Sequence, residues 1–167
     1  IPGNFMPAVQ KGFRERMERG VVAGYQVQNV CVEVHFGKHH DVDSSEAAFK
    51  TAASMAFRNV FQEAQPCLLE PIVTMGITVP ESHVGDVYSD MSSRGGKVQG
   101  TDAAGGNYQT VNCEVPLREV TTYSRTLSSM TGGQGSYAME FSHYDTMPTN
   151  IRQDIISRAK LQEEEDE

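Results

Sequence analysis

The first part of the chain has the apolar spacing of a helix, a strand and a second helix. Apolar residues recur at every fourth position over residues 5–19, which predicts a helix there. Residues 25–36 alternate apolar and polar side chains, with one shift of phase that is typical of a bulge, and predict a bent strand. Asp43 and Glu46 form a capping box, which predicts a second helix that ends at Pro66. The expected buried stripe of this helix consists of Phe49, Ala53, Ala56, Phe57, Val60, Phe61 and Ala64.

From Pro71 onward the pattern predicts a small domain of strands and helices. Residues 73–79 alternate as a strand does, and an apolar stripe from Val84 indicates a helix that Gly95 and Gly96 close. The remaining predicted elements are a hairpin of residues 97–100 and 109–115, a helix opened by Pro116, a strand over residues 137–141 and a helix over residues 148–160. The order βαββαβ predicts an α+β fold of the ferredoxin-like kind, an antiparallel sheet with its helices on one face.

The first part offers fewer elements than the second. It contains a helix, a strand, a helix and a short strand near residues 67–70, which is a thin set for an independent hydrophobic core. We therefore expect its partner strands in a segment upstream of Ile1. The predicted domains are residues 1–69, residues 70–160 and a tail of residues 161–167.

Composition is that of an ordinary globular protein. Of the 167 residues, 38% are apolar and 22% are charged, which is too apolar for a disordered chain. No apolar run approaches the ~20 residues of a membrane-spanning helix, and no signal peptide opens the sequence, so we expect no membrane partner. Because the chain begins with Ile1 and Pro2 rather than methionine, we expect it to be a processed piece or an excised fragment.

The net charge of −8 comes largely from the tail, where residues 163–167 are all acidic. Without them the net charge is −3, so no general basic field favours nucleic acid, and any RNA contact must be local. The three cysteines, Cys31, Cys67 and Cys113, are widely spaced and odd in number, which argues against a disulfide framework. A reducing, cytoplasmic location fits this pattern best.

The densest polar cluster lies in the loop after the first predicted strand. It contains His35, His39, His40, Asp41 and Asp43, which are residue types that bind metal ions. Adjacent histidines point in different directions, however, and Asp43 is expected to cap the next helix. A solvated loop tip, or a loop displayed to a partner, is therefore favoured over a metal site.

Two glycine-containing motifs give little support for catalysis. The Gly-Gly-Gln at residues 132–134 matches the tripeptide with which release factors approach peptidyl-tRNA, but its position favours a helix cap and a tight turn. The Gly-Gly-Lys at residues 95–97 lacks the remainder of a phosphate-binding loop.

Cys31 and Cys113 lie in predicted strands and are expected to be buried, inert thiols. We expect no catalytic residue and no cofactor in this chain.

Ordered strings over nearly the whole chain resemble bacterial elongation factor G. Those at residues 2–9 (PGNFMPAV), 20–25 (GVVAGY) and 40–50 (HDVDSSEAAFK) are similar to the later half of that family's fourth domain. The string at 68–72 (LLEPI) resembles its junction into the fifth domain. Further strings, at 85–87 (GDV), 93–96 (SRGG), 115–117 (VPL) and 137–141 (YAMEF), resemble the fifth domain in order.

The resemblance implies a fourth domain of βαβ type with a left-handed crossover, followed by a ferredoxin-like fifth domain. It also implies a ribosomal translocase whose GTPase domain, with its GTP and Mg²⁺, lies upstream, so that this chain by itself is no enzyme. In that family the tip of the fourth domain enters the decoding region and holds the tRNA–mRNA duplex as it moves. The fifth domain reaches the stalk base and the sarcin-ricin region of the large subunit.

The resemblance further implies which residues meet RNA. The expected tip consists of Gly37, Lys38, His39, His40 and Asp41, with His40 at the position of the family's tip histidine. The residues expected to face ribosomal RNA are Ser92, Ser93, Arg94, Ser128, Thr131, Gly133 and Gln134. The family usually has an arginine where this chain has Ser128, and basic residues in the loop beyond. Fewer cations mean fewer phosphate contacts, so the hypothesis of a paralogous factor with a different role on the ribosome stays open.

Two other functions also stay open at this point. A ribosomal protection protein that expels an antibiotic shares the architecture, although the sequence of residues 39–43 (HHDVD) is more typical of the translocase. A stand-alone regulatory module is the second, because ferredoxin-like domains often bind small effectors and fold alone does not establish function. A phosphate-binding loop far upstream of Ile1 would decide for the GTPase.

Overall fold

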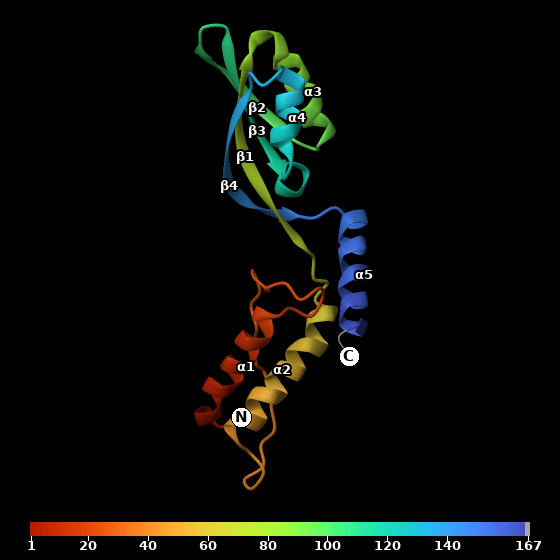
Figure 1. The fold of residues 1–167 in the computed structure, drawn as a ribbon. Coiled ribbons are helices and arrows are strands. Elements are labelled where there is room, and N and C mark those ends of the chain that lie inside the picture. Colours follow the sequence, from red (N-terminus) through yellow and green to blue (C-terminus); the bar gives the residue numbers. More distant parts are fainter. Residues whose placement is uncertain (166–167) are drawn as a thin grey trace. The chain divides into compact units, whose positions relative to one another are not determined.

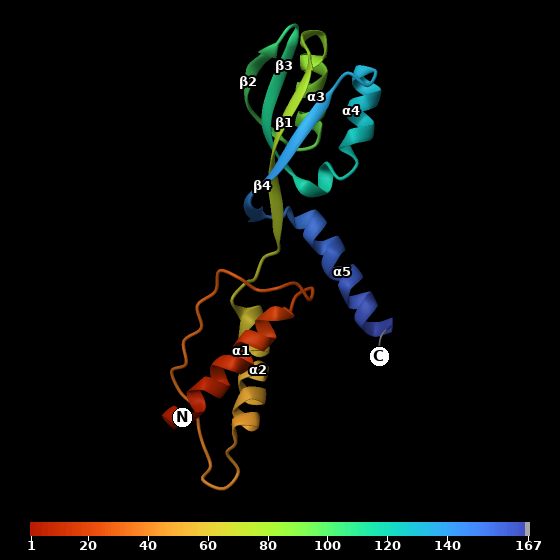
Figure 2. The ribbon, with the colours of Figure 1, turned by 60° about the vertical axis from the view of Figure 1, so that its left-hand side comes forward.

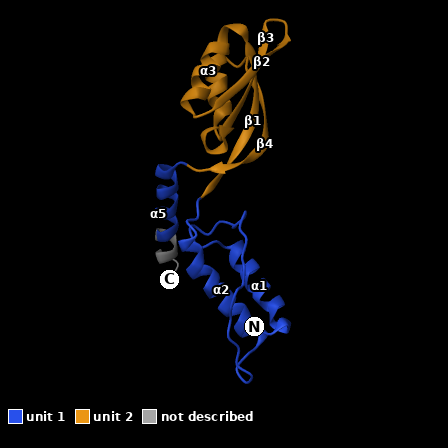
Figure 3. Cartoon of the chain, turned by 180° about the vertical axis from the view of Figure 1, so that it is seen from behind, with its two compact units in different colours: residues 1–67, 148–167 blue, residues 68–147 orange. Residues whose placement is uncertain are grey.

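A computed structural model describes the backbone of residues 1–165 and the side chains of residues 1–160. The chain forms two compact units (Figure 3). Unit 2 consists of residues 68–147, and unit 1 of the residues on either side of it. The boundary thus lies two residues before the expected one, and the terminal helix groups with unit 1. The side chains of the expected acidic tail, residues 161–167, lie outside the described part.

Unit 2 is a four-stranded antiparallel sheet with helices on one face (Figure 1). The strand order is β2-β3-β1-β4, so a further strand lies between the two strands of each βαβ unit. This arrangement confirms the predicted ferredoxin-like α+β fold. In chain order the elements are β1 (Leu69–Pro80), a 3-10 turn (Glu81–His83), α3 (Val84–Ser93), β2 (Lys97–Gly105), β3 (Tyr108–Pro116), a 3-10 turn (Leu117–Glu119), α4 (Tyr123–Thr131) and β4 (Ser136–Thr146).

The core of unit 2 lies between the sheet and its two helices. Alternate residues of β1 and β3 point into it, which is why Thr78 and Thr110 face the other side and hydrogen bond to each other at 2.8 Å. The buried residues are Val73, Met75, Ile77, Val79, Val87, Met91, Val111, Cys113, Val115, Val120, Tyr123 and Leu127.

Several predicted boundaries in unit 2 are wrong. The short strand expected near residues 67–70 is the beginning of β1, whose first part pairs with the end of β4. The register shifts between Ile72 and Val73, where Ser142 of β4 is the extra residue of a bulge. The helix expected to start at Pro116 starts at Tyr123 instead, because Pro116 ends β3 and a short 3-10 turn precedes α4.

Unit 1 contains a pair of packed helices, α1 (Met6–Glu18) and α2 (Glu46–Glu63), and a terminal helix, α5 (Thr149–Glu165). A 3-10 turn (Gly3–Phe5) precedes α1. Val9, Phe49 and Ala53 form the buried contact between α1 and α2, and the ring of Phe5 stacks on Phe49 with centroids 4.6 Å apart. The helices approach closely at Gly12, where a Cβ would lie 2.3 Å from the Lys50 carbonyl oxygen.

The strand predicted over residues 25–36 is absent. The segment is extended but irregular (Figure 2), and main-chain bonds hold only its beginning, Val27 N–H to the Met17 carbonyl at 2.8 Å and Gly20 N–H to the Tyr25 carbonyl at 3.0 Å. A strand requires a neighbouring strand for its N–H and C=O groups, and within residues 1–165 none lies beside this segment. Cys31 is consequently exposed and not buried.

The start of α2 also differs from the prediction. Ser45 and not Asp43 is the N-cap, because Ser45 has extended backbone angles and its hydroxyl accepts a bond from Ala48 N–H at 3.1 Å. The buried stripe is narrower than expected, since Val60 is 62% exposed and only one face of the helix meets α1. At the other end of the chain, α5 continues to Glu165, past the predicted end at residue 160, and glutamate is a good helix former.

No helix within the described residues is both long and apolar enough to cross a membrane.

The two units should differ in local stability. Because the buried cluster of unit 1 is much smaller than that of unit 2, amides of residues 1–65 are expected to exchange at least about ten-fold faster than those of residues 72–145. Hydrogen exchange measured by mass spectrometry, at concentrations where the chain is monomeric, checks this. Equal protection of the two segments would contradict it.

The three thiols should differ in reactivity. Cys31 and Cys67 are exposed, whereas Cys113 is buried in the sheet and burial raises the pKa of its thiol to about 11. Because the thiolate is the reactive form, a disulfide reagent at mildly alkaline pH should modify two thiols rapidly and the third only after unfolding in urea. Three fast thiols in the folded chain would show that the core opens near Cys113.

Candidate nucleic-acid interface

The expected tip, residues 37–41, lies in the loop that leads into α2. A turn over residues 41–43 closes this loop, and two hydrogen bonds hold it. The His40 main-chain N–H donates to Ser44 Oγ at 2.9 Å, and the Ser44 N–H donates to the His40 carbonyl at 3.1 Å. With Ser45 capping the helix directly behind it, the loop presents its side chains from a fixed base.

The two tip histidines have different surroundings. His39 Nε2 lies 3.6 Å from an oxygen of Asp41, so its ring is directed toward that carboxylate. The His40 residue is exposed, and no ion pair within the described residues involves its ring. Of the pair, His40 is therefore the one whose imidazole remains available to another molecule.

A glycine stands at the start of the tip, beside the side chain of Ile1. The side chain of Ile1 occupies the space beside Gly37, where a Cβ would lie 2.4 Å from Ile1 carbon atoms. Any other residue at position 37 would displace Ile1 or the loop. Lys38, which follows, is exposed.

The alternative metal site is not assembled. Within the described part of the chain, no three His, Cys, Asp or Glu side chains lie close enough together to hold an ion. His35 instead contacts Glu33 at 3.3 Å, on an exposed part of the extended segment.

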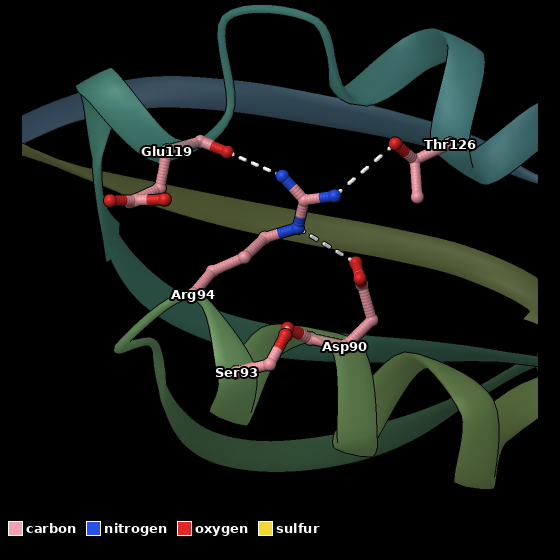
Figure 4. Close-up of polar contacts among 5 residues, drawn as sticks. All are labelled: Asp90, Ser93, Arg94, Glu119 and Thr126. Atoms are coloured by element: carbon pink, nitrogen blue, oxygen red, sulfur yellow. Dashed lines mark hydrogen bonds and ion pairs between the residues drawn. The ribbon is translucent and has the colours of Figure 1, made fainter.

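Arg94, expected to face ribosomal RNA, holds unit 2 together (Figure 4). Its Nε donates to Asp90 Oδ2 at 2.9 Å, its Nη1 to the Glu119 carbonyl at 2.5 Å and its Nη2 to Thr126 Oγ1 at 3.2 Å. The guanidinium carbon also lies 5.3 Å from the centroid of the Tyr123 ring. With all three nitrogens engaged and the side chain 19% exposed, the residue joins the end of α3 to the start of α4.

Thr131 is also committed to the fold. It is 2% exposed, and its hydroxyl donates to the Leu127 carbonyl and accepts from Gly135 N–H, both at 2.8 Å. Its side chain is thus buried within unit 2, and its hydroxyl is engaged by the main chain of α4 and of the turn that follows. Gly132, next in sequence, adopts a left-handed φ of 60° as the C-cap of α4. The Gly-Gly-Gln tripeptide thus forms the helix cap and turn that its position predicted.

The other expected RNA-facing residues lie on the surface in two groups. Ser92 and Ser93 are exposed at the end of α3, close to Arg94. Ser128 is exposed on α4, and Gly133 and Gln134 are exposed in the turn that follows it. Arg94 contacts the first half of α4, whereas this turn follows the C-terminal end of that helix.

A second arginine of unit 2 was not predicted as a structural residue. Arg118 Nε donates to Glu70 Oε2 at 2.7 Å, and its Nη1 bonds to the Glu119 carboxylate. Glu70 is only 5% exposed, so Arg118 is the partner that compensates the cost of burying its carboxylate. The two residues are 48 positions apart, and sequence spacing carries no signal for such a pair. The pair of Asp90 and Arg94 does have such a signal, because an acidic and a basic residue stand at positions i and i+4.

Replacing Arg94 by alanine should destabilise unit 2. The change removes three hydrogen bonds donated by a charged guanidinium, one of them to a carboxylate, and leaves the mostly buried Asp90 without this partner, so the free energy of unfolding is expected to fall by about 2 kcal/mol. Urea denaturation measures the loss. The matched control is Arg125→Ala on the exposed side of α4, which should stay within about 0.5 kcal/mol of the parent chain. A similar loss for both variants would mean that the network contributes nothing.

Comparison with known proteins also divides the chain in two near residue 66, although the second matched region runs to residue 155 and so includes the first part of α5. Residues 1–65 match the family described as Elongation factor G, domain IV, and residues 67–155 match the family described as Elongation factor G C-terminus. The chain is also similar to a crystal structure of a protein from Thermus thermophilus, with 41% sequence identity and a TM-score of 0.85. The match covers 96% of this chain and 24% of the Thermus chain, so the chain spans about a quarter of that relative's length. The chain belongs to the elongation factor G family, with residues 1–65 in its domain IV region and residues 67–155 in its C-terminal region.

Proposed function

We propose that this chain is the ribosome-binding, tRNA-positioning part of a translational GTPase that promotes movement of tRNA and mRNA in protein synthesis. The observation that carries the proposal is the match of two consecutive elongation factor G regions to nearly the whole chain. The exposed tip supports it, because a loop with a fixed base and outward side chains suits contact with a large partner.

The tip is the proposed contact with the tRNA–mRNA duplex. His40 is the central residue, since its ring is free to stack or to hydrogen bond, and Lys38 adds one positive charge beside it. The contact of His39 with Asp41 gives that histidine a different role, which is to stabilise the loop itself.

Unit 2 is the proposed contact with the large-subunit RNA near the stalk base. Its accessible candidates are Ser92 and Ser93 at the end of α3, and Ser128, Gly133 and Gln134 on and after α4. Arg94 serves this surface indirectly, by fixing the end of α3 against α4. Hydroxyl, amide and main-chain groups give positioning contacts with phosphate and sugar.

Neither matched region is a GTPase domain. We therefore propose that the chain alone hydrolyses no GTP, that GTP and Mg²⁺ bind elsewhere in the whole factor, and that the factor acts in the cytoplasm. Without the rest of the factor, binding to the ribosome should be weak, because the contacts of the other domains are lost.

The tip histidine should affect movement and not folding. In a full-length factor that contains this chain, His40→Ala should slow tRNA–mRNA translocation by about ten-fold, the loss of roughly one good contact in the transition state. The rate of ribosome-stimulated GTP hydrolysis should stay near that of the parent factor. The free energy of unfolding should change by less than about 0.5 kcal/mol, because the residue is exposed. Stopped-flow measurement of mRNA movement and of phosphate release checks both parts.

The matched control is His39→Ala, on the neighbouring residue whose ring is directed toward Asp41. It should have a smaller effect on translocation. Equal rates for the parent and His40→Ala would remove His40 from the proposed contact, and a parent factor without translocation activity would overturn the proposed function.

A further inference from the structure

The sheet of unit 2 has two edge strands, and they differ in how well they are protected against further pairing. The strand order β2-β3-β1-β4 places β2 and β4 at the edges (Figure 1). All four strands of the ferredoxin-like sheet are present in residues 68–147, so neither edge results from a missing strand of this unit. An edge strand presents unpaired N–H and C=O groups to another strand, and natural proteins usually block it with charged side chains, proline or bulges.

The edge strand β2 carries such protection. Its register with β3 shifts at two places, so its backbone is an irregular template for another strand. Lys97 and Asp102 are exposed charged residues of this strand. None of residues 97–105 is an exposed large apolar residue. A further strand would therefore gain little by pairing with β2.

The edge strand β4 is more open. It pairs with β1 in unbroken register up to its bulge, and this part contains a single charged residue, Glu140. On the face of the sheet that the helices cover, Met139 is 42% exposed and Phe141 is 60% exposed. Their direct partners on β1, Met75 and Val73, are buried in the core. The apolar row of the core thus continues onto an open edge.

A helix covers only one end of this apolar row. The ring of Tyr137 is partly buried and meets the ring of Tyr123 of α4 edge-on, with centroids 5.4 Å apart. The ring of Phe141, four residues further along the strand, lies 5.1 Å from that of Tyr144, which is itself 50% exposed. The row therefore has a covered ring at one end and an open ring at the other.

We propose that two copies of this chain associate through the edge of β4, by antiparallel pairing of the two β4 strands about a two-fold axis. In the register that the side chains favour, Met139 lies opposite Met139 of the second copy, and Tyr137 lies opposite Phe141. The open ring of each copy then lies beside the covered ring of the other, and aromatic pairs across strands are stabilising. Glu140 falls opposite Ala138, so no two like charges oppose each other directly.

Other registers of the same pairing are less favourable. Centring the pair on Glu140 would place two carboxylates directly opposite each other, which destabilises a sheet. A shift by one residue would turn the apolar sides of the two strands to opposite faces of the joined sheet. A second copy thus supplies the open strand edge, the apolar row and the complementary order of rings at once, as an isologous contact requires.

Sedimentation equilibrium of the isolated chain tests the pairing without ribosomes, and therefore independently of the proposed function. Because the contact is small, dimers should predominate at about 0.1 mM chain and dissociate at about 1 µM. Met139→Lys, which gives β4 a lysine as β2 has in Lys97, should raise the dissociation constant at least about ten-fold. The matched control is Met55→Lys on α2, where the parent methionine is 61% exposed, and it should leave association unchanged.

A cysteine on β4 tests the register, and it keeps the inference testable if the lysine variant fails to fold. In a chain with Cys31→Ser and Cys67→Ser, the further change Met139→Cys should give a disulfide between two copies on mild oxidation. Directly opposed residues of antiparallel strands lie close enough for such a bond. Phe141→Cys in the same background should cross-link much more slowly, because Phe141 lies opposite Tyr137 and not opposite itself.

Three outcomes would overturn the inference. A parent chain that stays monomeric at every concentration would leave the β4 edge to a strand of another polypeptide. Equal association of the parent chain and of Met139→Lys, with circular dichroism showing that the variant is folded, would place the contact on another surface. Faster cross-linking through a cysteine at position 141 than through one at position 139 would contradict the register and the ring pairs on which the proposal depends.

Discussion

Buried main-chain N–H and C=O groups must form hydrogen bonds, and this requirement explains why the two units of the chain differ in structure. In unit 2 the central strand β1 pairs with β3 on one side and with β4 on the other, which fixes the register of alternate residues that point into the core. The packing of α3 and α4, the Arg94 contacts and the turns at both ends of α4 depend on that sheet. In unit 1 no strand within residues 1–165 accompanies residues 25–36, so this segment stays extended and exposed, and only the α1–α2 contact forms a core.

Sequence periodicity predicted the elements whose partners lie in this chain. The alternation at Val73, Met75, Ile77 and Val79 indicated a strand, and these residues are buried because β3, β4 and the helices surround them. The same kind of alternation at residues 25–36 predicted a strand, and this prediction was wrong. Alternation indicates which side chains share one face of a sheet, but it does not show whether a neighbouring strand exists. The N-cap of α2 was predicted two residues too early, at Asp43. Serine and aspartate both cap helices, and in the structure Ser45 is the residue with the extended backbone angles of an N-cap.

The candidate interface could be predicted only in part. The loop of residues 37–41 follows from a polar run before a helix, and it is exposed as expected. The roles of Arg94 and Thr131 could not be read from the sequence, because exposure depends on which helix covers them. An arginine beside glycines resembles a phosphate contact, yet its guanidinium is engaged by Glu119 and Thr126, residues that lie 25 and 32 positions away. Long-range pairs of this kind arise from topology and leave no mark in local spacing.

The pairing at the base of unit 2 has a consequence for modular architecture. The Met147 N–H donates to the Leu68 carbonyl at 2.9 Å, so the chain enters and leaves unit 2 at adjacent points. In the division into compact units, residues 68–147 lie between the two sequence segments that make up unit 1. A domain whose ends meet in this way can be excised, replaced or grafted into a surface loop of another protein without stretching the host chain.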